Sequence, residues 1–308
     1  MRDRSQLTWG ADHLACFKTM DSLRTRATRI GNQLNSPSNP HATLLRLVWS
    51  ILRTTRDLVK ERRAVFLWWS PGLGLWLHRW PEGRAADVRW WRTAHAWATE
   101  GGMHDMNDLL WRHYAPKAGD VVLDIGAGHG GETFFLAPMV GPTGRVLAVE
   151  AAPAPFRRLS DLVCRNGWRN VILEEVALSD RAGTVSISGD ENWITGNIYD
   201  GTGTVQVEAV TLDELCTKHG IDHIDWLKMN IEGAEREAVR GMERMAPNIR
   251  HLTISCHDFL GTEWGRSKVV VIEWLTGHGF EVIEHGPGPA WAEDYVYAHR
   301  EGISADET

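Results

Sequence analysis

The sequence has few cysteines and no long hydrophobic run. Its four cysteines are far apart and form no CxxC pair, which argues against a disulfide framework or a cysteine-pair zinc site and favours a reducing, cytoplasmic setting. The longest apolar stretch, 64–77, is interrupted by Ser70, Pro71 and Gly72. Because a spanning helix needs about 20 apolar residues, we expect no transmembrane segment. No N-terminal pattern of basic start, apolar run and cleavage site predicts secretion.

Positive charge is scarce in the second part of the chain. Residues 1–115 hold 17 Lys and Arg and 10 Asp and Glu, and the totals of 33 and 40 leave 16 basic and 30 acidic residues for 116–308. Ten of the sixteen tryptophans also precede residue 116. An acidic surface does not grip a phosphate backbone, so we expect no nucleic-acid partner. The composition predicts a helical, basic, Trp-rich N-terminal module at 1–100 and a second domain at 101–308.

Within the N-terminal module, apolar residues recur at helical spacing between His41 and Arg63, with basic residues among them. This pattern predicts an amphipathic helix, and several tryptophans follow it up to Trp80. Such a helix either packs on the neighbouring domain or on a second copy in a homo-oligomer, or contacts a membrane surface through 41–80. Packing is the more common role of an amphipathic surface helix.

From residue 121 onward, short apolar strands alternate with helical segments. The expected parallel strands are 121–125, 146–149, 171–176, 226–231 and 251–256, and the segments 280–284 and 295–299 are expected to close the sheet as an antiparallel hairpin. This alternation predicts an α/β fold with a doubly wound, mainly parallel seven-stranded sheet.

A glycine-rich segment directly follows the first of these strands. It runs from Asp124 through Gly126 and Gly128 to Gly130, and glycines at a strand-to-helix turn let a ligand approach the backbone closely. The acid at the strand end suits an ammonium group and would repel a pyrophosphate. Glu150 ends the next strand, where a carboxylate accepts hydrogen bonds from ribose hydroxyls. The pattern favours S-adenosylmethionine over NAD as the cofactor.

Five blocks, in order, resemble the FkbM-type methyltransferases, a branch of the class I S-adenosylmethionine-dependent enzymes. The blocks are 122–128, 149–151, 176–180, 210–213 and 227–235, and the resemblance spans roughly 103–300. It implies a Rossmann-like fold and O-methylation of a hydroxyl on a sugar, glycolipid or related secondary metabolite. The last block has Asn230 where the family commonly has Asp.

The cofactor site is expected at the ends of the first strands and at the helix that follows the glycines. Its candidate residues are Asp124, Gly126, Ala127, Gly128, Gly130, Glu132, Thr133, Glu150, Ala151, Val176, Ala177 and Asn230.

O-methyl transfer requires an aligned acceptor oxygen and a group that removes its proton. His257 is the leading candidate for this general base, because an unperturbed imidazole titrates near neutrality. Asp258 or Glu232 is expected to orient it. In the alternative interpretations, His257 caps a loop, and Glu232 binds the cofactor's amino-acid part or pins the turn at Gly233. A divalent metal on Glu232, His257 and Asp258 is not favoured, because they form no tight carboxylate motif.

The expected acceptor is a small molecule that contains carbohydrate. The polar-aromatic stretch 189–204 would cover it, since amides and aromatic rings suit a sugar. Two alternatives remain: a membrane- or partner-docking protein with a degenerate cofactor fold, and an NAD-linked oxidoreductase. The intact glycines disfavour the first, and the missing second βαβαβ half disfavours the other.

Overall fold

The structure, a computed structural model, describes residues 109–187, 205–263 and 265–300 in full. It also describes the backbone of three strands between 66 and 88, and four helical positions between 48 and 55. The chain divides into two compact units, Met1–Ala94 and His95–Thr308.

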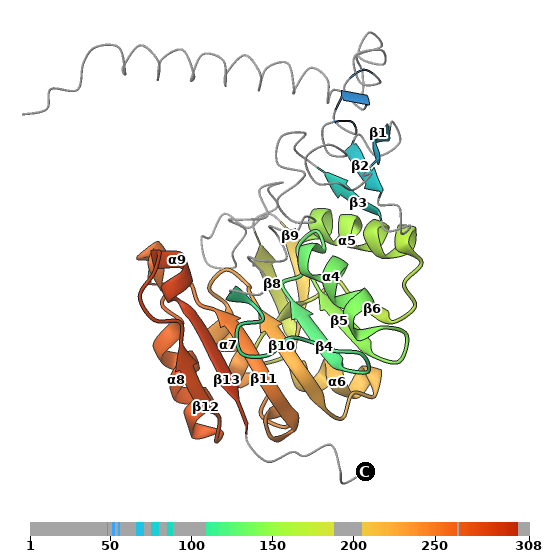
Figure 1. Ribbon diagram of the computed structural model, residues 1–308. Helices are drawn as coiled ribbons and strands as arrows, with labels where there is room; N and C mark the ends of the chain where they lie inside the picture. The colour runs from blue at the N-terminus through green and yellow to red at the C-terminus, as the bar shows by residue number, and fades with distance from the viewer. Residues whose placement is uncertain are drawn as a thin grey trace, which may run out of the picture. The chain divides into compact units, whose positions relative to one another are not determined.

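The first unit contains a small antiparallel sheet (Figure 1). Its strands are β1 (Phe66–Ser70), β2 (Leu75–Arg79) and β3 (Ala85–Val88), in the order β1-β2-β3. The expectation of a helical module over 1–100 is therefore wrong for these strands. Their short runs are rich in Trp, Phe and Val, which favour strands, and Pro71 and Gly72 separate the first two. Upstream, the described positions Val48, Ile51, Leu52 and Thr55 are helical.

The second unit is built on a seven-stranded sheet in the order β12-β13-β11-β10-β4-β5-β6 (Figure 1). The strands are β4 (Val121–Ile125), β5 (Arg145–Val149), β6 (Val171–Glu174), β10 (Ile224–Met229), β11 (Ile249–Ser255), β12 (Glu281–Glu284) and β13 (Tyr295–His299). Strand β13 is antiparallel to both neighbours, and the other pairs are parallel. This sheet confirms the predicted fold class, including its closing hairpin.

Helices connect the strands and cover the sheet. They are α4 (Gly131–Val140), α5 (Pro153–Asn166), α6 (Leu212–His219), α7 (Glu235–Arg240), α8 (Lys268–Gly277) and α9 (Ala290–Glu293), with 3-10 turns η2 (Ala246–Asn248) and η3 (Asp258–Leu260). A second small sheet, β7-β9-β8, consists of β7 (Ala177–Leu178), β8 (Gly183–Ile187) and β9 (Val205–Val210). Local sequence explains the boundaries of α6, because Thr211 and Glu214 form a capping box and Gly220 ends the helix at φ 60°.

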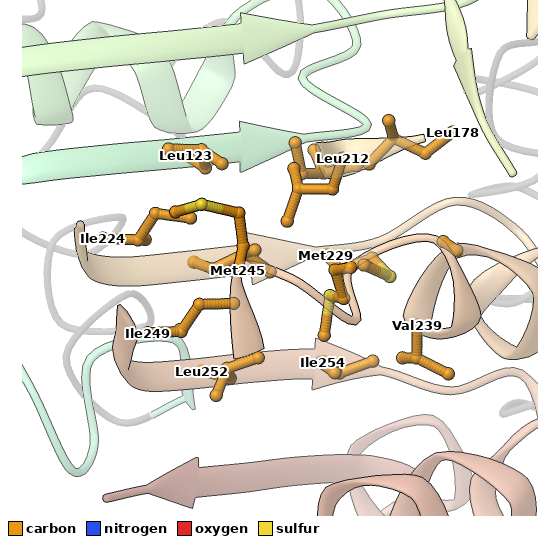
Figure 2. Close-up of a cluster of buried hydrophobic side chains, with 14 of the residues drawn as sticks. Leu123, Leu178, Leu212, Ile224, Met229, Val239, Met245, Ile249, Leu252 and Ile254 are labelled. Atoms are coloured by element: carbon orange, nitrogen blue, oxygen red, sulfur yellow. The ribbon is translucent and has the colours of Figure 1, made fainter. Parts of the chain in front are cut away.

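The hydrophobic core lies between the sheet and helices α6, α7 and α8 (Figure 2). Leu123, Met229 and Ile254 extend from β4, β10 and β11 and pack against side chains such as Leu212 and Val239. Each is fully buried, and burial of such a side chain stabilises the fold by about 1.5–3 kcal/mol. The central strands therefore form a rigid frame for the loops at their ends.

The strand order reverses between β4 and β10. From β4 the chain continues outward to β5 and β6, and later returns to β10 and β11 on the other side of β4. In doubly wound sheets, ligands bind beyond the carboxyl ends of the strands at this reversal. The loops after Ile125 and Met229 therefore define where a site is expected.

Candidate active site

The segment 126–130, here called the glycine turn, has a backbone that only glycine adopts easily. Gly126, Gly128 and Gly130 have φ of 73°, 56° and 87°, in the left-handed region that L side chains rarely occupy. The amides of Gly126 and Ala127 both donate to the carbonyl of Val149, at 2.9 Å. The turn is thus fastened to the end of the neighbouring strand β5.

The glycine turn touches the loop after β10. A Cβ added to Gly126 would lie 1.9 Å from the carbonyl oxygen of Asn230, so no larger residue fits there. The Asn230 amide donates to the carbonyl of Ile125 at 3.0 Å. Its side-chain Oδ1 is buried and has no hydrogen-bond partner among the described residues. Buried polar atoms rarely lack a partner, so this oxygen fits a donor on a ligand.

Asp124 supports the glycine turn from below. Its carboxylate is fully buried and accepts hydrogen bonds from Thr133 Oγ1 at 2.7 Å and from Lys228 Nζ at 3.0 Å. Lys228 also donates to the carbonyl of Gly126 at 2.7 Å. The chain itself therefore engages both carboxylate oxygens of Asp124, which is buried beneath the turn.

Lys228 compensates the charge beneath the turn. Only 2% of its side chain is exposed, and burial alone would lower its pKa. The carboxylates of Asp124 and Glu132 outweigh burial and raise the pKa of Lys228 above its ordinary value. Burial also raises the pKa of Glu132, although Lys228 opposes this shift. The ammonium of Lys228 is therefore charged and fixed.

Glu150 closes the glycine turn on the β5 side. Its Oε2 accepts from the Gly128 amide at 2.8 Å, and its Oε1 accepts from the Ala152 amide at 2.7 Å. Burial raises the pKa of the Glu150 carboxyl, and these two amides oppose that shift. The half-buried Ala151 lies between Glu150 and Ala152, so the expected ribose-binding acid is held at the edge of the turn.

Two expected cofactor residues lie apart from these contacts. Val176 is 6% exposed and packs in the hydrophobic core. Ala177 begins β7 and pairs with Ala209. A ligand could reach them only through backbone atoms or a small methyl group.

The second half of the site is the acid–histidine cluster, which consists of Glu232, Glu235 and His257. His257 follows β11 and is buried. Its Nδ1 lies 3.0 Å from Glu235 Oε1, and its Nε2 lies 3.5 Å from Glu232 Oε2. The structure therefore brings Glu232 to His257, as one of the sequence interpretations expects.

Asp258 has a different environment from the one expected. Its Oδ2 accepts from the amides of Ser267 at 3.0 Å and Lys268 at 2.9 Å. These amides open α8, where unpaired N–H groups favour a carboxylate. Asp258 therefore caps α8, and the second carboxylate beside the His257 ring is that of Glu235.

Glu235 is the functional candidate that sequence reasoning missed. Its carboxylate is fully buried, with Oε1 accepting from the amides of Ile231 at 3.1 Å and Gly233 at 3.2 Å. Its Oε2 accepts from Ser267 Oγ at 3.0 Å. The available signal was a second glutamate three residues after Glu232 in the block 227–235, but the periodicity of that block does not indicate its burial.

The electrostatics of His257 differ from those of an exposed imidazole. Burial lowers its pKa, but hydrogen bonds and charges from Glu232 and Glu235 raise the pKa of His257 to about 10. Burial likewise opposes ionisation of Glu235, yet His257 and backbone amides lower the pKa of Glu235. An unperturbed pKa near neutrality, the premise for His257 as base, does not hold in this structure.

Glu232 has an unusual backbone. Its φ of 55° makes it the one non-glycine residue with positive φ among the described residues. A glutamate in this region costs free energy, and such conformations concentrate at functional sites. Its side chain is 22% exposed against 4% for His257. Glu232 is thus the member of the acid–histidine cluster that an incoming molecule can reach.

The model of the Methyltransferase FkbM domain family matches residues 124–282, just over half of the chain. The chain belongs to this family. FkbM-domain methyltransferases use S-adenosylmethionine, so the chain is an S-adenosylmethionine-dependent methyltransferase, which decides against an NAD-linked oxidoreductase. The match begins at Asp124 and includes the glycine turn and the acid–histidine cluster.

The chain is also similar to individual proteins. The chain is similar to the 31-O-demethyl-FK506 methyltransferase FkbM of Streptomyces tacrolimicus, with 28% identity over 219 residues, covering 60% of this chain and 82% of that protein. It is also similar to the 2-O-methyltransferase NoeI of Sinorhizobium fredii, with 28% identity over 148 residues, covering 41% of this chain and 58% of that protein. A solved methyltransferase FkbM from Methylobacillus flagellatus KT matches with a TM-score of 0.43 and 15% identity, covering 61% of this chain and 45% of that one.

The site of this FkbM-domain protein fits a nucleoside cofactor that carries an amino-acid group. The close backbone approach at Gly126 leaves no Cβ in the way, and Asn230 Oδ1 lacks a partner among the described residues. Those residues contain no group of three or more His, Cys, Asp or Glu side chains placed to hold a metal ion. The three metal candidates are otherwise engaged, because Glu232 and Glu235 face both nitrogens of His257, and Asp258 caps α8.

No helix in the described part of the chain is long and apolar enough to cross a membrane.

Proposed function

We propose that this FkbM-domain methyltransferase methylates a hydroxyl oxygen of a small molecule, and that the acceptor contains carbohydrate. The observation that supports this proposal is the acid–histidine cluster at the end of β10 and β11, one loop away from the glycine turn. Asn230, which touches Gly126, is two residues from Glu232. A proton acceptor thus stands beside the cofactor's expected place.

The glycine turn, Glu150 and Asn230 are the groups that would hold the cofactor. S-adenosylmethionine supplies a sulfonium-activated methyl group, which an acceptor oxygen displaces in line. The carboxylate of Glu150 offers acceptors for ribose hydroxyls. Asn230 Oδ1 offers an acceptor for an ammonium or hydroxyl donor. Lys228 keeps the turn rigid from beneath.

The acceptor hydroxyl must lose its proton to the protein during transfer. Glu232 is the accessible carboxylate of the cluster. The imidazole of His257 lies behind it and stabilises Glu232 both before and after it takes up the proton. This arrangement needs no metal to bind the oxygen. The O–H group of the acceptor becomes more acidic as the oxygen–methyl bond forms. A carboxylate is then a strong enough base to remove its proton.

The acceptor class draws on the relatives. The names of these two related proteins specify transfer to oxygen: one is a 31-O-demethyl-FK506 methyltransferase, and the other is a 2-O-methyltransferase. The polar-aromatic stretch 189–204, which is expected to cover a sugar, lies outside the described residues.

The test uses the purified full chain with methyl-labelled S-adenosylmethionine and a panel of acceptors: oligosaccharides, glycolipids, hydroxylated polyketides and matched amines. We expect label on a hydroxyl oxygen of a carbohydrate-containing acceptor. Glu232→Gln should lower kcat by about 10²–10⁴-fold and leave S-adenosylmethionine affinity measured by calorimetry unchanged. Label on amines alone, or equal turnover by Glu232→Gln, contradicts the proposal.

A second proposal concerns the N-terminal unit, which we infer contacts a membrane surface. Val48, Ile51 and Leu52 lie on consecutive turns of a helix and are 46%, 58% and 58% exposed. Exposed apolar side chains beside basic residues suit an anionic bilayer surface. Flotation of the full chain with anionic vesicles should fail for the double variant Ile51→Asp/Leu52→Asp. A concentration-dependent dimer that this variant disrupts, without flotation, would favour a homo-oligomer contact instead.

A further inference from the structure

Glu235 connects every part of the acid–histidine cluster. Its carboxylate accepts from the amides of Ile231 and Gly233, which flank Glu232, and from Ser267 Oγ at the start of α8. The same carboxylate lies 3.0 Å from Nδ1 of His257. Three separate segments, the loop after β10, the loop after β11 and the start of α8, thus meet at one buried side chain.

We propose that Glu235 is the positioning residue of this site: it fixes the His257 imidazole as a charged group and fixes the turn that presents Glu232, which leaves Glu232 as the proton acceptor. This inference rests on the proposed hydroxyl methylation for the part that concerns Glu232. The geometry that supports it does not depend on which acceptor binds.

Glu235 is fully buried, which constrains the charge of its neighbours. A fully buried carboxylate is costly unless hydrogen bonds or an opposite charge compensate it. Glu235 has two amides, one hydroxyl and an imidazole around its two oxygens. A neutral imidazole has one N–H, whereas a charged one has two. Only the charged form has an N–H on both ring nitrogens, the one 3.0 Å from Glu235 and the one 3.5 Å from Glu232.

The proton that leaves the acceptor needs a group with a free lone pair. A charged imidazole has no free lone pair and cannot accept a proton. Glu232 is a carboxylate with 22% of its side chain exposed. The hydroxyl proton therefore passes to a carboxylate oxygen of Glu232 as the oxygen–methyl bond forms and the methyl–sulfur bond breaks, and it leaves to solvent afterwards. The charge of His257, whose Nε2 lies 3.5 Å from Glu232 Oε2, favours the position of the Glu232 carboxylate.

Glu235 also stabilises the backbone turn at Glu232. Its φ of 55° is followed by 104° at Gly233, a turn that costs free energy for a glutamate. The carboxylate of Glu235 binds the amides on both sides of it, at Ile231 and Gly233. These two hydrogen bonds stabilise a conformation that Glu232 would not adopt by itself.

Other ionisable groups lie around the cluster. The thiol of Cys256 lies near Glu235, and the carboxylate of Asp294 lies near His257, Asp258 and Lys268. Asp258 binds α8, and Asp294 accepts from the Phe259 amide. The nearest carboxylates to the two ring nitrogens remain Glu232 and Glu235.

The decisive measurement is an NMR titration of the histidine rings in the wild-type chain, with the His257 signal assigned by its loss in His257→Gln. We expect His257 to remain charged at pH 8.5, about two units above an ordinary histidine. A midpoint between pH 6 and 7 overturns the proposal. This measurement needs no acceptor, and it uses a variant only to assign the signal.

Variants then separate the roles. Glu235→Gln keeps a side-chain acceptor but removes the charge, so the His257 midpoint should fall by about one unit or more, and kcat should fall by about tenfold or more with S-adenosylmethionine affinity retained. Asp258→Asn is the matched control, because it neutralises a neighbouring carboxylate that does not face the ring, and it should move the midpoint by less than about half a unit. Equal shifts in both variants overturn the positioning role.

Failure of the proposed function gives a different result. If no hydroxyl acceptor is methylated while His257 stays charged and responds to Glu235→Gln, the acceptor chemistry is wrong and the positioning of His257 stands. If methylation proceeds while His257 titrates as an ordinary histidine, the proposed function stands and the role of Glu235 is overturned.

Discussion

The glycine turn and the acid–histidine cluster lie side by side at the carboxyl edge of one sheet, yet they are built differently. In the turn, backbone groups make the contacts, and the acid beneath it, Asp124, is matched by one ammonium from Lys228. In the cluster, two carboxylates share one imidazole, and Glu232 has a strained backbone. Burial raises the pKa of Glu132, the second acid near Lys228, which favours its neutral form. The charges of Asp124 and Lys228 then compensate each other, which makes the turn a compensated scaffold, whereas the cluster retains one negative charge more than its imidazole neutralises. This difference suits a binding half and a reacting half.

The largest effect on stability is expected when Lys228, which compensates the charge of Asp124, is replaced. Lys228→Met leaves the carboxylate of Asp124 buried without its partner, and loss of one member of a buried ion pair costs about 3–5 kcal/mol. The free energy of unfolding from urea titration should fall by about that amount. Adding Asp124→Asn should restore part of it, because the buried charge is then gone. A loss below about 1 kcal/mol would mean that the pair is solvated like a surface salt bridge.

The scaffold could be predicted from sequence because its signals are local. Strand β4, the glycines and the acid ending β5 are consecutive or nearly so, and the closing hairpin follows from two short apolar runs. The seven-stranded sheet was therefore expected correctly. Glu150 accepts from the amide of Gly128 in the turn, and its binding of ribose stays a prediction.

The acid–histidine cluster could be predicted only in part, because its contacts join distant segments. The pairing of His257 with Glu232 was among the expected arrangements, but the roles of Glu235 and Asp258 depend on where α8 begins. The shifted pKa of His257 also depends on burial, which residue spacing does not report. At the N-terminus, strand propensity in 66–88 was overlooked in favour of helical spacing upstream.

A second substitution tests whether the scaffold depends on the backbone alone. Gly126→Ala places a methyl group 1.9 Å from the Asn230 carbonyl in the present geometry, so the two loops must separate. A displacement near 1 Å in a site costs about 10²-fold in rate, so kcat should fall by about that factor, and calorimetry should show weaker S-adenosylmethionine binding. Gly220→Ala is the control, since Gly220 has a similar φ of 60° and nothing within 4 Å. Equal loss of affinity in both variants would indicate general destabilisation.

A smaller effect is expected at the edge of the turn. In Glu150→Gln the amide nitrogen replaces one of the two oxygens that accept from Gly128 and Ala152, and an unpaired buried donor costs about 1–3 kcal/mol. S-adenosylmethionine affinity should fall by about tenfold, which is about 1.4 kcal/mol. Glu174→Gln, at the end of β6, changes an acid paired with Lys218 and should leave this affinity unchanged. Unchanged affinity in Glu150→Gln would remove Glu150 from the cofactor site.

The smallest effect separates the acid–histidine cluster from the helix cap beside it. Asp258→Ala removes the acceptor for two amides at the start of α8, and loss of such a cap costs about 1 kcal/mol. Asp258→Asn keeps an acceptor oxygen, so its stability should change by only a few tenths of a kcal/mol. The Asp258 carboxylate binds the start of α8 and not the ring of His257. Neither variant should therefore lower kcat under conditions in which it is folded. A tenfold loss of kcat in Asp258→Asn at full stability would instead place Asp258 in the cluster, because only removal of its charge could then explain the loss.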